Sequence, residues 1–158
     1  MDSLFNYQAK IATPFAILGI ATSGNYLTGI DYLSLANATL PAQNQLAQKV
    51  QKQIERYLRD PNYEFDLPLF VNGTVHQNKV WREISKIRPG QTLTYSDIAT
   101  KVRSGPRAVG GACGSNPIPL IVPCHRVVAK NGLGGFARSR HGNYLDIKRW
   151  LLAHEHAG

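Results

Sequence analysis

Apolar residues recur at helical spacing between Asn44 and Leu58. Five of them fall on one face of this segment: Leu46, Val50, Ile54, Tyr57 and Leu58. Asp60-Pro61 follows and ends the pattern, because proline lacks the amide hydrogen that a further helical turn would use. The segment is therefore predicted to be an amphipathic helix that packs on a sheet.

The residues before this helix favour β-structure. Short β-prone segments lie near Lys10 to Ile20 and Tyr26 to Leu35, and the turn signal Ser23-Gly24-Asn25 separates them. We expect a small hairpin or sheet here. After the helix, the stretch Asn62 to Phe70 is expected to be extended and to lead into a second module.

The second half of the chain predicts short helices divided by glycine, proline and serine. Thr74 can cap a first helix, and Pro89-Gly90 would end it. Its inner face would carry four apolar residues: Val80, Trp81, Ile84 and Ile87. Thr94 can cap a second helix with Asp97 at its third position, where a carboxylate meets the positive end of the helix.

A third helix, Arg107 to Gly114, is predicted to consist mostly of glycine and alanine. Each glycine costs a helix about 1 kcal/mol relative to alanine, so another interaction should offset that cost. The small residues would allow another surface to approach closely, either a DNA groove, with Arg107 at the head of the helix, or a neighbouring helix. Short helices joined by a turn in a basic context indicate a helix-turn-helix.

These patterns together predict an α+β protein. Residues 1–68 would form a small sheet with one helix, and residues 69–158 would form a mainly helical domain that contains the helix-turn-helix.

Composition narrows the setting in which the protein works. The chain has 158 residues, of which 43% are apolar, and no run approaches the roughly 18 to 20 apolar residues that span a bilayer. Only two cysteines occur, Cys113 and Cys124, and they form neither a C-x-x-C pair nor a dense disulfide pattern. We therefore expect free thiols in a reducing compartment, the cytoplasm or, in a eukaryote, the nucleus, and no association with a membrane.

The net charge of +8 favours a polyanionic partner through counterion release, although a solvated basic surface would give the same total. The second half of the chain contributes much of the excess through Arg103, Arg107, Arg126, Lys130, Arg138, Arg140, Lys148 and Arg149.

The stretch from Ser115 to Val128 is the most informative chemically. Three prolines, at positions 117, 119 and 123, make it a rigid and partly extended element, because each fixes its own φ and biases its predecessor away from helix. Cys124, His125 and Arg126 follow directly. A histidine can accept the proton of a thiol, and an arginine can stabilise the resulting thiolate.

A cysteine beside a histidine has other interpretations. A buried cysteine often serves only as a small apolar side chain, and adjacent residues in regular structure usually point apart, so a bridging water would be needed for proton transfer. Cys113, Cys124 and His125 do not make a four-ligand zinc pattern, and no cysteine precedes position 113, so no metal site is expected.

The sequence Pro123-Cys124-His125-Arg126-Val127 resembles the active-site signature of the O6-alkylguanine-DNA alkyltransferases, also called methylated-DNA-protein-cysteine methyltransferases. Three further motifs stand in the family's order: Arg107-Ala108-Val109-Gly110 with Ala112, Asn116-Pro117, and Trp150 to Glu155. The likeness covers about Phe70 to Glu155. The first sixty residues resemble the variable N-terminal module, which has a ribonuclease H-like fold in this family.

The resemblance implies direct repair of alkylated DNA. Cys124 would accept the alkyl group of O6-alkylguanine, and of O4-alkylthymine, irreversibly and in a single turnover. His125 would act as the base through a water, Glu155 would orient the imidazole, and Asn116 would support the network and the turn.

The resemblance also implies that the damaged base leaves the duplex, because a buried thiol cannot reach O6 inside a base pair. Arg107 would fill the vacated stack, and Tyr95 would contact the DNA backbone and the flipped base. Further DNA contacts would come from Ala108, Gly110, Ala112 and Arg126, with the helix in the minor groove.

Around the substrate, the resemblance implies that Val127 offers its carbonyl to the guanine amine and that the loop from Asn131 to Gly142 closes the pocket through Phe136 and Ala137. The sequence departs from the family here, because Arg138-Ser139-Arg140-His141 lengthens the loop and Phe136 lacks a tyrosine hydroxyl.

The expected partner is double-stranded DNA that contains alkylated bases, with no cofactor, no metal and no obligatory protein partner. Three rival functions explain less of the sequence. A damage-recognition protein without transfer activity would not carry cysteine at position 124, and a thiol hydrolase would not need the helix-turn-helix with Arg107. A plain DNA-binding regulator would not need the proline-braced Cys124-His125.

Overall fold

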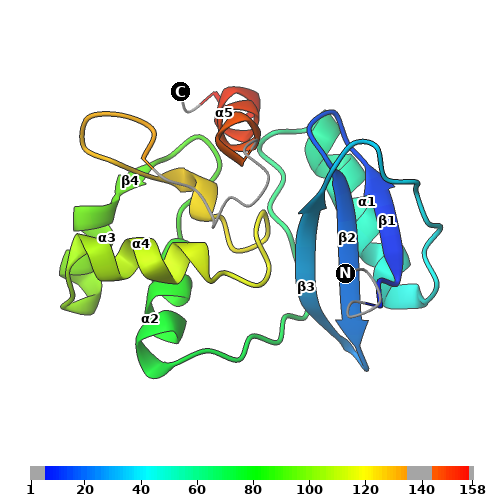
Figure 1. The fold of residues 1–158 in the computed structure, drawn as a ribbon, viewed down its shortest axis with the longest axis horizontal. Helices are drawn as coiled ribbons and strands as arrows, with labels where there is room; N and C mark the ends of the chain where they lie inside the picture. Colours follow the sequence, from blue (N-terminus) through cyan, green and yellow to red (C-terminus); the bar gives the residue numbers. More distant parts are fainter. Residues whose placement is uncertain (1–5, 135–143, 157–158) are drawn as a thin grey trace. The chain divides into compact units, whose positions relative to one another are not determined.

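The computed structural model describes residues 6–134 and 144–156. The chain divides into two compact units, Met1–Val71 and Asn72–Gly158. The architecture is α+β, as expected from the sequence, with two small sheets and helices in both units (Figure 1).

The first unit is built on a three-stranded antiparallel sheet of β1 (Ala9–Ala12), β2 (Ile17–Ser23) and β3 (Tyr26–Leu33). The segment expected near Lys10 to Ile20 is thus two strands. Thr13 forms the turn between them, because its hydroxyl donates to the carbonyl of Ala16 at 2.6 Å and accepts from the amide of Ala16 at 3.0 Å. The predicted turn between β2 and β3 is confirmed, with Gly24 at a φ of +57°.

Helix α1 (Gln45–Arg59) packs on this sheet (Figure 1). The amphipathic prediction is confirmed, since the buried face of the helix carries Ala47, Val50, Gln53, Ile54 and Tyr57. The side chain of Gln53 exchanges two hydrogen bonds of 2.9 Å with the backbone of Asp66. The extended segment after the helix is thereby fixed to α1 by one buried amide.

The second unit begins with α2 (Val75–Ile84), which starts at the predicted cap Thr74. The helix ends earlier than the sequence indicated, because Ser85 takes the last capping position and Ile87 lies in the following turn. Val80, Trp81, Ile84 and Ile87 are nevertheless all buried. The indole Nε1 of Trp81 donates to the carbonyl of Ala112 at 2.9 Å and attaches α2 to α4.

Three further helices complete this unit: α3 (Tyr95–Val102), α4 (Pro106–Gly114) and α5 (Tyr144–His154). The predicted capping box of Thr94 and Asp97 is present at the start of α3, and Arg103 ends the helix in the left-handed region at a φ of 56°. α2, α3 and α4 pack on one another, and α5 packs on a short 3₁₀ turn, η2 (Cys124–Arg126).

A two-stranded parallel sheet joins β4 (Leu93–Thr94) to β5 (Val127–Val128). β4 leads directly into α3, and β5 follows directly after η2. The pairing of Thr94 with Val128 therefore brings the first turn of α3 next to the segment that carries Cys124.

Within the described residues, no helix combines the length and the apolar character that a membrane span requires.

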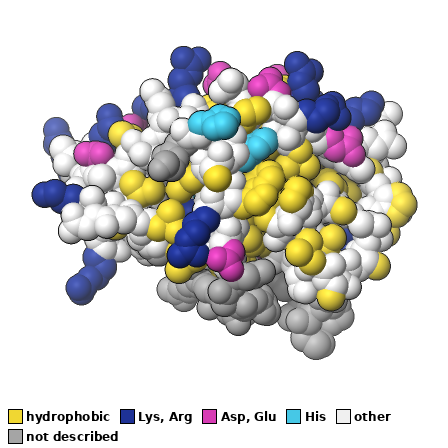
Figure 2. All heavy atoms as spheres, turned by 90° about the horizontal axis from the view of Figure 1, so that it is seen from above, with side chains coloured by type: hydrophobic (Ala, Val, Ile, Leu, Met, Phe, Trp, Pro, Cys, Tyr) yellow, Lys and Arg dark blue, Asp and Glu magenta, His cyan; other side chains and the backbone are white. Residues whose placement is uncertain are grey.

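The Lys and Arg side chains on the face shown in Figure 2 are dispersed and do not form one patch.

Helix α1 allows a direct test of the fold. The side chain of Asn44 accepts a hydrogen bond from the amide of Ala47 at 2.8 Å and donates to Thr22 at 3.0 Å. We expect Asn44→Ala to lower the free energy of unfolding by about 1 kcal/mol, because one helix amide loses its cap. Urea denaturation followed by circular dichroism measures this change. The exposed Lys49→Ala serves as the control and should change stability by less than about 0.5 kcal/mol; equal effects would remove the role assigned to the cap.

Candidate active site

Asn116 holds the backbone that precedes the 3₁₀ turn η2, the reactive turn of this site. Its Nδ2 donates to the carbonyl of Val122 at 2.8 Å and to Cys124 Sγ at 3.2 Å, while its Oδ1 accepts from the amide of Ile118 at 2.9 Å. One amide side chain thus fixes both ends of the proline-rich segment. The same side chain places a hydrogen-bond donor on the sulfur.

Cys124 begins η2 and is only 3% exposed. Both cysteines are free thiols and both are buried. A hydrogen bond with Cys113 and burial raise the pKa of Cys124, whereas the amide of Asn116 and the charge of Lys148 act in the opposite direction. If this thiol is to act as a nucleophile, its polar neighbours must lower its pKa by more than burial raises it.

His125 follows Cys124 in the chain, and its side chain is buried. Its Nε2 is 2.9 Å from Glu155 Oε2, and both side chains are fully buried. Burial lowers the pKa of His125 despite the opposing effect of Glu155, so the imidazole is neutral at pH 7. Since Glu155 is a carboxylate, Nε2 carries the hydrogen and Nδ1 carries the lone pair. Nδ1 is buried and has no hydrogen-bond partner within the described part of the chain.

Arg126 shares the same carboxylate. Its Nε and Nη2 donate to the two oxygens of Glu155, each at 2.9 Å, and its Nη1 donates to the carbonyl of Ile87 at 2.7 Å. Burial alone would raise the pKa of Glu155, but the hydrogen bonds and charges of His125 and Arg126 outweigh it and hold that pKa well below its usual range. The carboxylate therefore stays ionised inside the protein.

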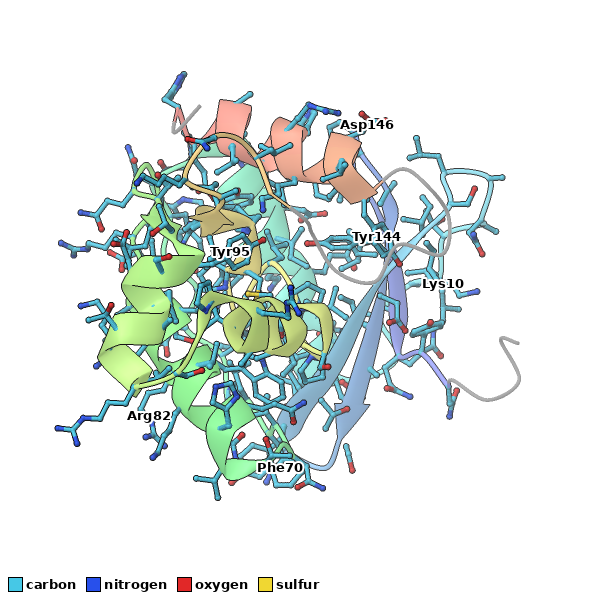
Figure 3. All side chains as sticks on the ribbon, turned by 60° about the vertical axis from the view of Figure 1, so that its left-hand side comes forward. Lys10, Phe70, Arg82, Tyr95, Tyr144 and Asp146 are labelled. Carbon is cyan, nitrogen blue, oxygen red and sulfur yellow. The ribbon has the colours of Figure 1, made fainter. Side chains whose placement is uncertain are left out.

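Tyr95 is half-buried at the start of α3 (Figure 3). A Cβ on Gly134, whose φ is +74°, would be 2.8 Å from the tyrosine ring, and a Cβ on Gly110 would be 4.0 Å from it. Burial raises the pKa of Tyr95, and the nearby sulfurs of Cys113 and Cys124 raise it further. The ring is thus a neutral phenol packed between two glycines near the sulfurs of Cys113 and Cys124.

The exposed face of α4 contains few side-chain atoms. Arg107, Ala108 and Gly111 are exposed, and nothing lies within 4 Å of the Cβ position of Gly111. Val109 and Ala112 point inward. Another molecule could therefore approach the backbone of α4 closely along this face, beside the guanidinium of Arg107.

Comparisons with known proteins agree with this geometry. The family described as 6-O-methylguanine DNA methyltransferase, DNA binding domain, matches residues 75–157, which is more than half of the chain. A methylated-DNA–protein-cysteine methyltransferase of Metallosphaera sedula is 35% identical over 89% of this chain and 86% of that protein. This chain belongs to the 6-O-methylguanine DNA methyltransferase family.

Solved structures show the same relationship. The crystal structure of Mycobacterium tuberculosis O6-methylguanine methyltransferase matches with a TM-score of 0.79 and 31% identity over 95% of this chain and 92% of that one. A structure of the protein from the same organism in complex with DNA matches with a TM-score of 0.77 and 34% identity, over 92% and 90% of the two chains.

Two residues of this methyltransferase-family chain lie elsewhere than the sequence suggested. Arg126 was expected to contact DNA, but it is buried and its guanidinium is bonded to Glu155 and Ile87. Ala112 was expected on the DNA-facing side of its helix, but it is buried and its carbonyl accepts from Trp81. These two expectations are wrong, and Gly111 takes the exposed position that was assigned to Ala112.

Lys148 is a site residue that the sequence reasoning missed. It is 0% exposed, its Nζ donates to the carbonyl of Val127 at 2.7 Å, and it lies 5.8 Å from the centre of the Tyr95 ring. Burial lowers its pKa to about 8, while the two cysteines act in the opposite direction. A signal was available, because Lys148 shares helical spacing with Leu151, Leu152 and Glu155, so it belongs to the inner face of the last helix.

The carbonyl of Val127, expected to face the guanine amine, is thus bonded to Lys148, although a carbonyl has a second lone pair. Phe136, Ala137 and the segment Arg138 to His141 lie outside the described residues. Among the residues that are described, no group of three or more His, Cys, Asp or Glu could bind a metal ion.

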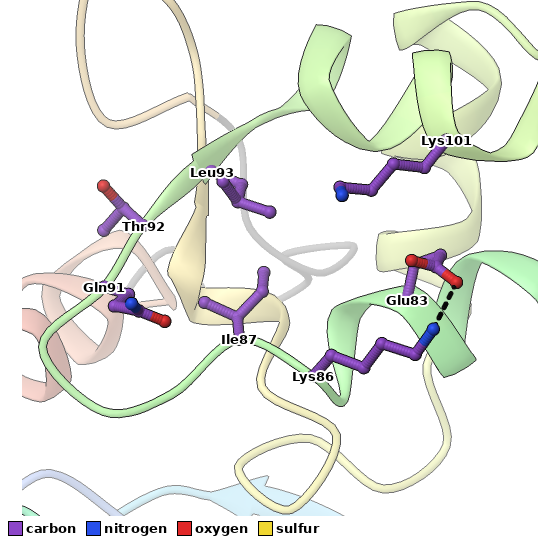
Figure 4. A pocket seen from close by; sticks show the side chains of 7 residues that line it. All are labelled: Glu83, Lys86, Ile87, Gln91, Thr92, Leu93 and Lys101. Atoms are coloured by element: carbon purple, nitrogen blue, oxygen red, sulfur yellow. Dashed lines mark hydrogen bonds and ion pairs between the residues drawn. The ribbon is translucent and has the colours of Figure 1, made fainter.

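A separate pocket of about 350 Å³ lies where α2 and the segment before β4 meet α3 (Figure 4). Its lining consists of Glu83, Lys86, Ile87, Gln91, Thr92, Leu93 and Lys101. Glu83 and Lys86 form an ion pair of 2.9 Å at its edge. The lining includes none of the predicted site residues, so this pocket is distinct from the site around Cys124.

The buried network predicts a specific pH dependence. Because the pKa of Glu155 is lower in the folded state than its ordinary 4.5, its contribution to stability is present above pH 4.5 and is lost as the pH falls below it. The pKa of His125 is also lower than its ordinary value of 6.5, so its contribution to stability is likewise lost as the pH falls below 6.5. We expect Glu155→Gln to destabilise the protein by about 3 kcal/mol at pH 7 and to reduce this loss of stability in acid.

Urea denaturation at a series of pH values between about 2 and 8 measures both effects. Glu83→Gln is the matched control, since it removes a partly exposed ion pair and should cost less than about 1 kcal/mol. A variant at position 155 that loses no more stability than this control would contradict the assigned network.

Proposed function

We propose that this protein repairs alkylated DNA by transferring the alkyl group from O6 of guanine, and from O4 of thymine, to Cys124 Sγ. The observation that carries the proposal is the bond from Asn116 to that sulfur, next to the His125–Glu155 pair, in a chain of the 6-O-methylguanine DNA methyltransferase family. These groups supply what a buried thiol needs to become a nucleophile: a donor to the sulfur, and a neutral base on the next residue of the chain.

The transfer is a displacement at the alkyl carbon. Cys124 Sγ attacks as the thiolate, the carbon–sulfur bond forms as the carbon–oxygen bond breaks, and the electron pair leaves on the guanine. His125 takes the thiol proton at Nδ1 through a water, since Nε2 is engaged by Glu155. Glu155 fixes the ring as a positioning residue. Arg126 neutralises much of the same carboxylate, so Glu155 stabilises an imidazolium only modestly.

Lys148 supports the thiolate in this proposal. Its buried ammonium lowers the pKa of the acceptor thiol. Its hydrogen bond to the carbonyl of Val127 holds it next to the residue that follows η2. Its own pKa of about 8 keeps most of it charged at neutral pH. The product thioether has a poor leaving group, so each protein molecule reacts once and the repaired DNA is released.

The DNA-binding part of the proposal rests on α3 and α4, taken as a helix-turn-helix. Cys124 is 3% exposed, so the alkylated base must leave the duplex and enter the protein to meet it. Arg107 at the head of α4 would fill the vacated space, and Ala108, Gly110 and Gly111 would lie against the minor groove. Tyr95 would contact the flipped base. The relative from Mycobacterium tuberculosis in complex with DNA supports DNA as the partner.

The remaining assignments follow the family resemblance. The second lone pair of the Val127 carbonyl would accept from the guanine amine. The first unit would be a ribonuclease H-like module. A damage-recognition protein without transfer is disfavoured, because Cys124 provides the acceptor that such a protein would not need.

The central prediction is a change in mass. Incubation with a short duplex that carries one O6-methylguanine should place a single methyl on the peptide that contains Cys124 and restore guanine in the DNA. Peptide mass spectrometry and nucleoside analysis measure the two products. Cys124→Ala should bind the duplex and transfer nothing. Tight binding without transfer by the unmodified protein would favour damage recognition, and more than one repaired base per protein would contradict a single turnover.

Arg107 gives a second test. We expect Arg107→Ala to slow repair of duplex DNA on the order of tenfold or more, because the vacated stack is left unfilled at a cost of a few kcal/mol. Its reaction with free O6-benzylguanine should be almost unchanged, since no base has to leave a duplex. Arg59→Ala, an exposed residue of α1 with the same change in charge, is the control. Equal losses on both substrates would exclude the assigned role of Arg107.

A further inference from the structure

A group of exposed cations lies where α2 and α3 pack on one another. Lys79 and Arg82 are three residues apart on α2, so they share one face of that helix, and Arg82 extends outward from it (Figure 3). Lys86 lies in the turn that follows α2. Lys101 lies in the last turn of α3, and Arg103 ends that helix. None of these five residues takes part in the chemistry described above or in the exposed face of α4.

These cations line two neighbouring hollows. The first is the pocket of about 350 Å³ described above, into which Lys101 extends from α3 (Figure 4). The second, of about 300 Å³, adjoins it, because Glu83 and Lys101 line both. The lining of the second hollow consists of Lys79, Arg82, Glu83, Lys101, Val102 and Arg103. The two hollows together are called the basic groove below.

The positive charge of the basic groove is only partly compensated. Among the described residues that line it, only Glu83 is acidic, and Glu83 pairs with Lys86 at 2.9 Å. Asp97 lies four residues before Lys101, but its carboxylate accepts from the backbone amide of Thr94 at 2.9 Å in the capping box. The four cations other than Lys86 form no ion pair within residues 6–134 and 144–156. Their charges are therefore available to an anionic group of another molecule.

One turn of the chain connects the basic groove with the exposed face of α4. His76 Nε2 lies 2.9 Å from Ser104 Oγ, so the turn between α3 and α4 is attached to the start of α2. The backbone amide of Arg103 donates to the carbonyl of Ala99, which fixes Arg103 at the end of α3. Arg107 follows four residues later, and four residues span at most about 14 Å, the length of roughly four base pairs. A duplex that lies along α4 therefore has its neighbouring phosphates within reach of the groove.

We propose that the basic groove binds the phosphodiester backbone of the DNA duplex, on one side of the place that α4 occupies. The proposal rests on the proposed binding of DNA by α4. The lining favours phosphates over bases, because it contains no aromatic side chain on which a base could stack. Cations spread over two hollows suit a row of phosphates better than a single small anion. Contacts of this kind hold a protein on DNA without reading its sequence.

The first test is the salt dependence of binding to an undamaged duplex of about 30 base pairs, or three helical turns, followed by fluorescence anisotropy of the labelled DNA. In the variant Lys79→Gln/Arg82→Gln, the slope of log affinity against log salt should fall by nearly two, because each lost phosphate contact removes about 0.9. The affinity near 0.1 M salt should fall on the order of tenfold or more. Lys52→Gln/Arg59→Gln makes the same change of charge on the exposed side of α1 and is the control.

A slope that stays the same, or that falls equally in the control, would overturn the proposal, since the effect would then belong to net charge alone. Lys101→Gln repeats the test from α3 and should lower the slope by about 0.9. This second variant guards against a folding defect in α2, and circular dichroism checks that each variant retains its helices.

Hydroxyl-radical footprinting locates the contact on the DNA. With Cys124→Ala bound to a duplex that carries one O6-methylguanine, we expect protected nucleotides around the lesion and a further protected group on one side of it. Adding Lys79→Gln/Arg82→Gln should remove the further group and keep the protection at the lesion. A reduced salt slope with an unchanged footprint would point to a second duplex in the groove and would contradict the proposal.

The salt titration uses undamaged DNA, which separates this proposal from alkyl transfer. If the slope falls as expected but the unmodified protein does not repair O6-methylguanine, the proposed transfer to Cys124 fails and the groove remains a DNA contact. If repair occurs and the slope does not change, the proposed function stands and the role of the basic groove is overturned.

Discussion

The buried carboxylate of Glu155 is the point on which the site depends. It accepts from His125 and from two nitrogens of Arg126, so a residue just after α5 fixes two of the three residues of η2. Burial would protonate an isolated carboxylate, but these partners keep it charged. None of the three side chains can be replaced alone without leaving a charge or a donor unsatisfied in the interior. This mutual dependence holds the reactive turn in one conformation.

The other side of the site is built on small residues. Gly110 and Gly134 lie on either side of the Tyr95 ring, and Lys148 lies near it. The parallel pairing of β4 with β5 is what brings the start of α3 to this place. A sheet of two residues per strand therefore connects the helical part that would meet DNA with the turn that carries the acceptor thiol.

Much of this arrangement could be predicted because its signals are local. Helical spacing identified α1, and the capping residues Thr74 and Thr94 located the starts of α2 and α3. The early end of α2 could not be predicted from Pro89-Gly90, because Ser85 and a turn end the helix before them.

The errors at the site have a different origin. Arg126 and Lys148 looked like surface charges, since burial of a cation depends on partners distant in sequence: Glu155 for one and the Val127 carbonyl for the other. Composition places such residues on the surface, and only tertiary contacts reverse that expectation. Ala112 was misplaced for a simpler reason, because on a helix of small residues the hydrophobic pattern hardly distinguishes the inner face from the outer one.

Asn116 has two roles in the site. The same amide that shapes the proline-rich segment also solvates the sulfur, through bonds to Val122, Ile118 and Cys124. Evolution cannot adjust the reactivity of the sulfur at this position without also altering the path of the chain. Tuning of the nucleophile must therefore come from neighbours that have no part in the turn, and the inner faces of α4 and α5 are where such variation remains open.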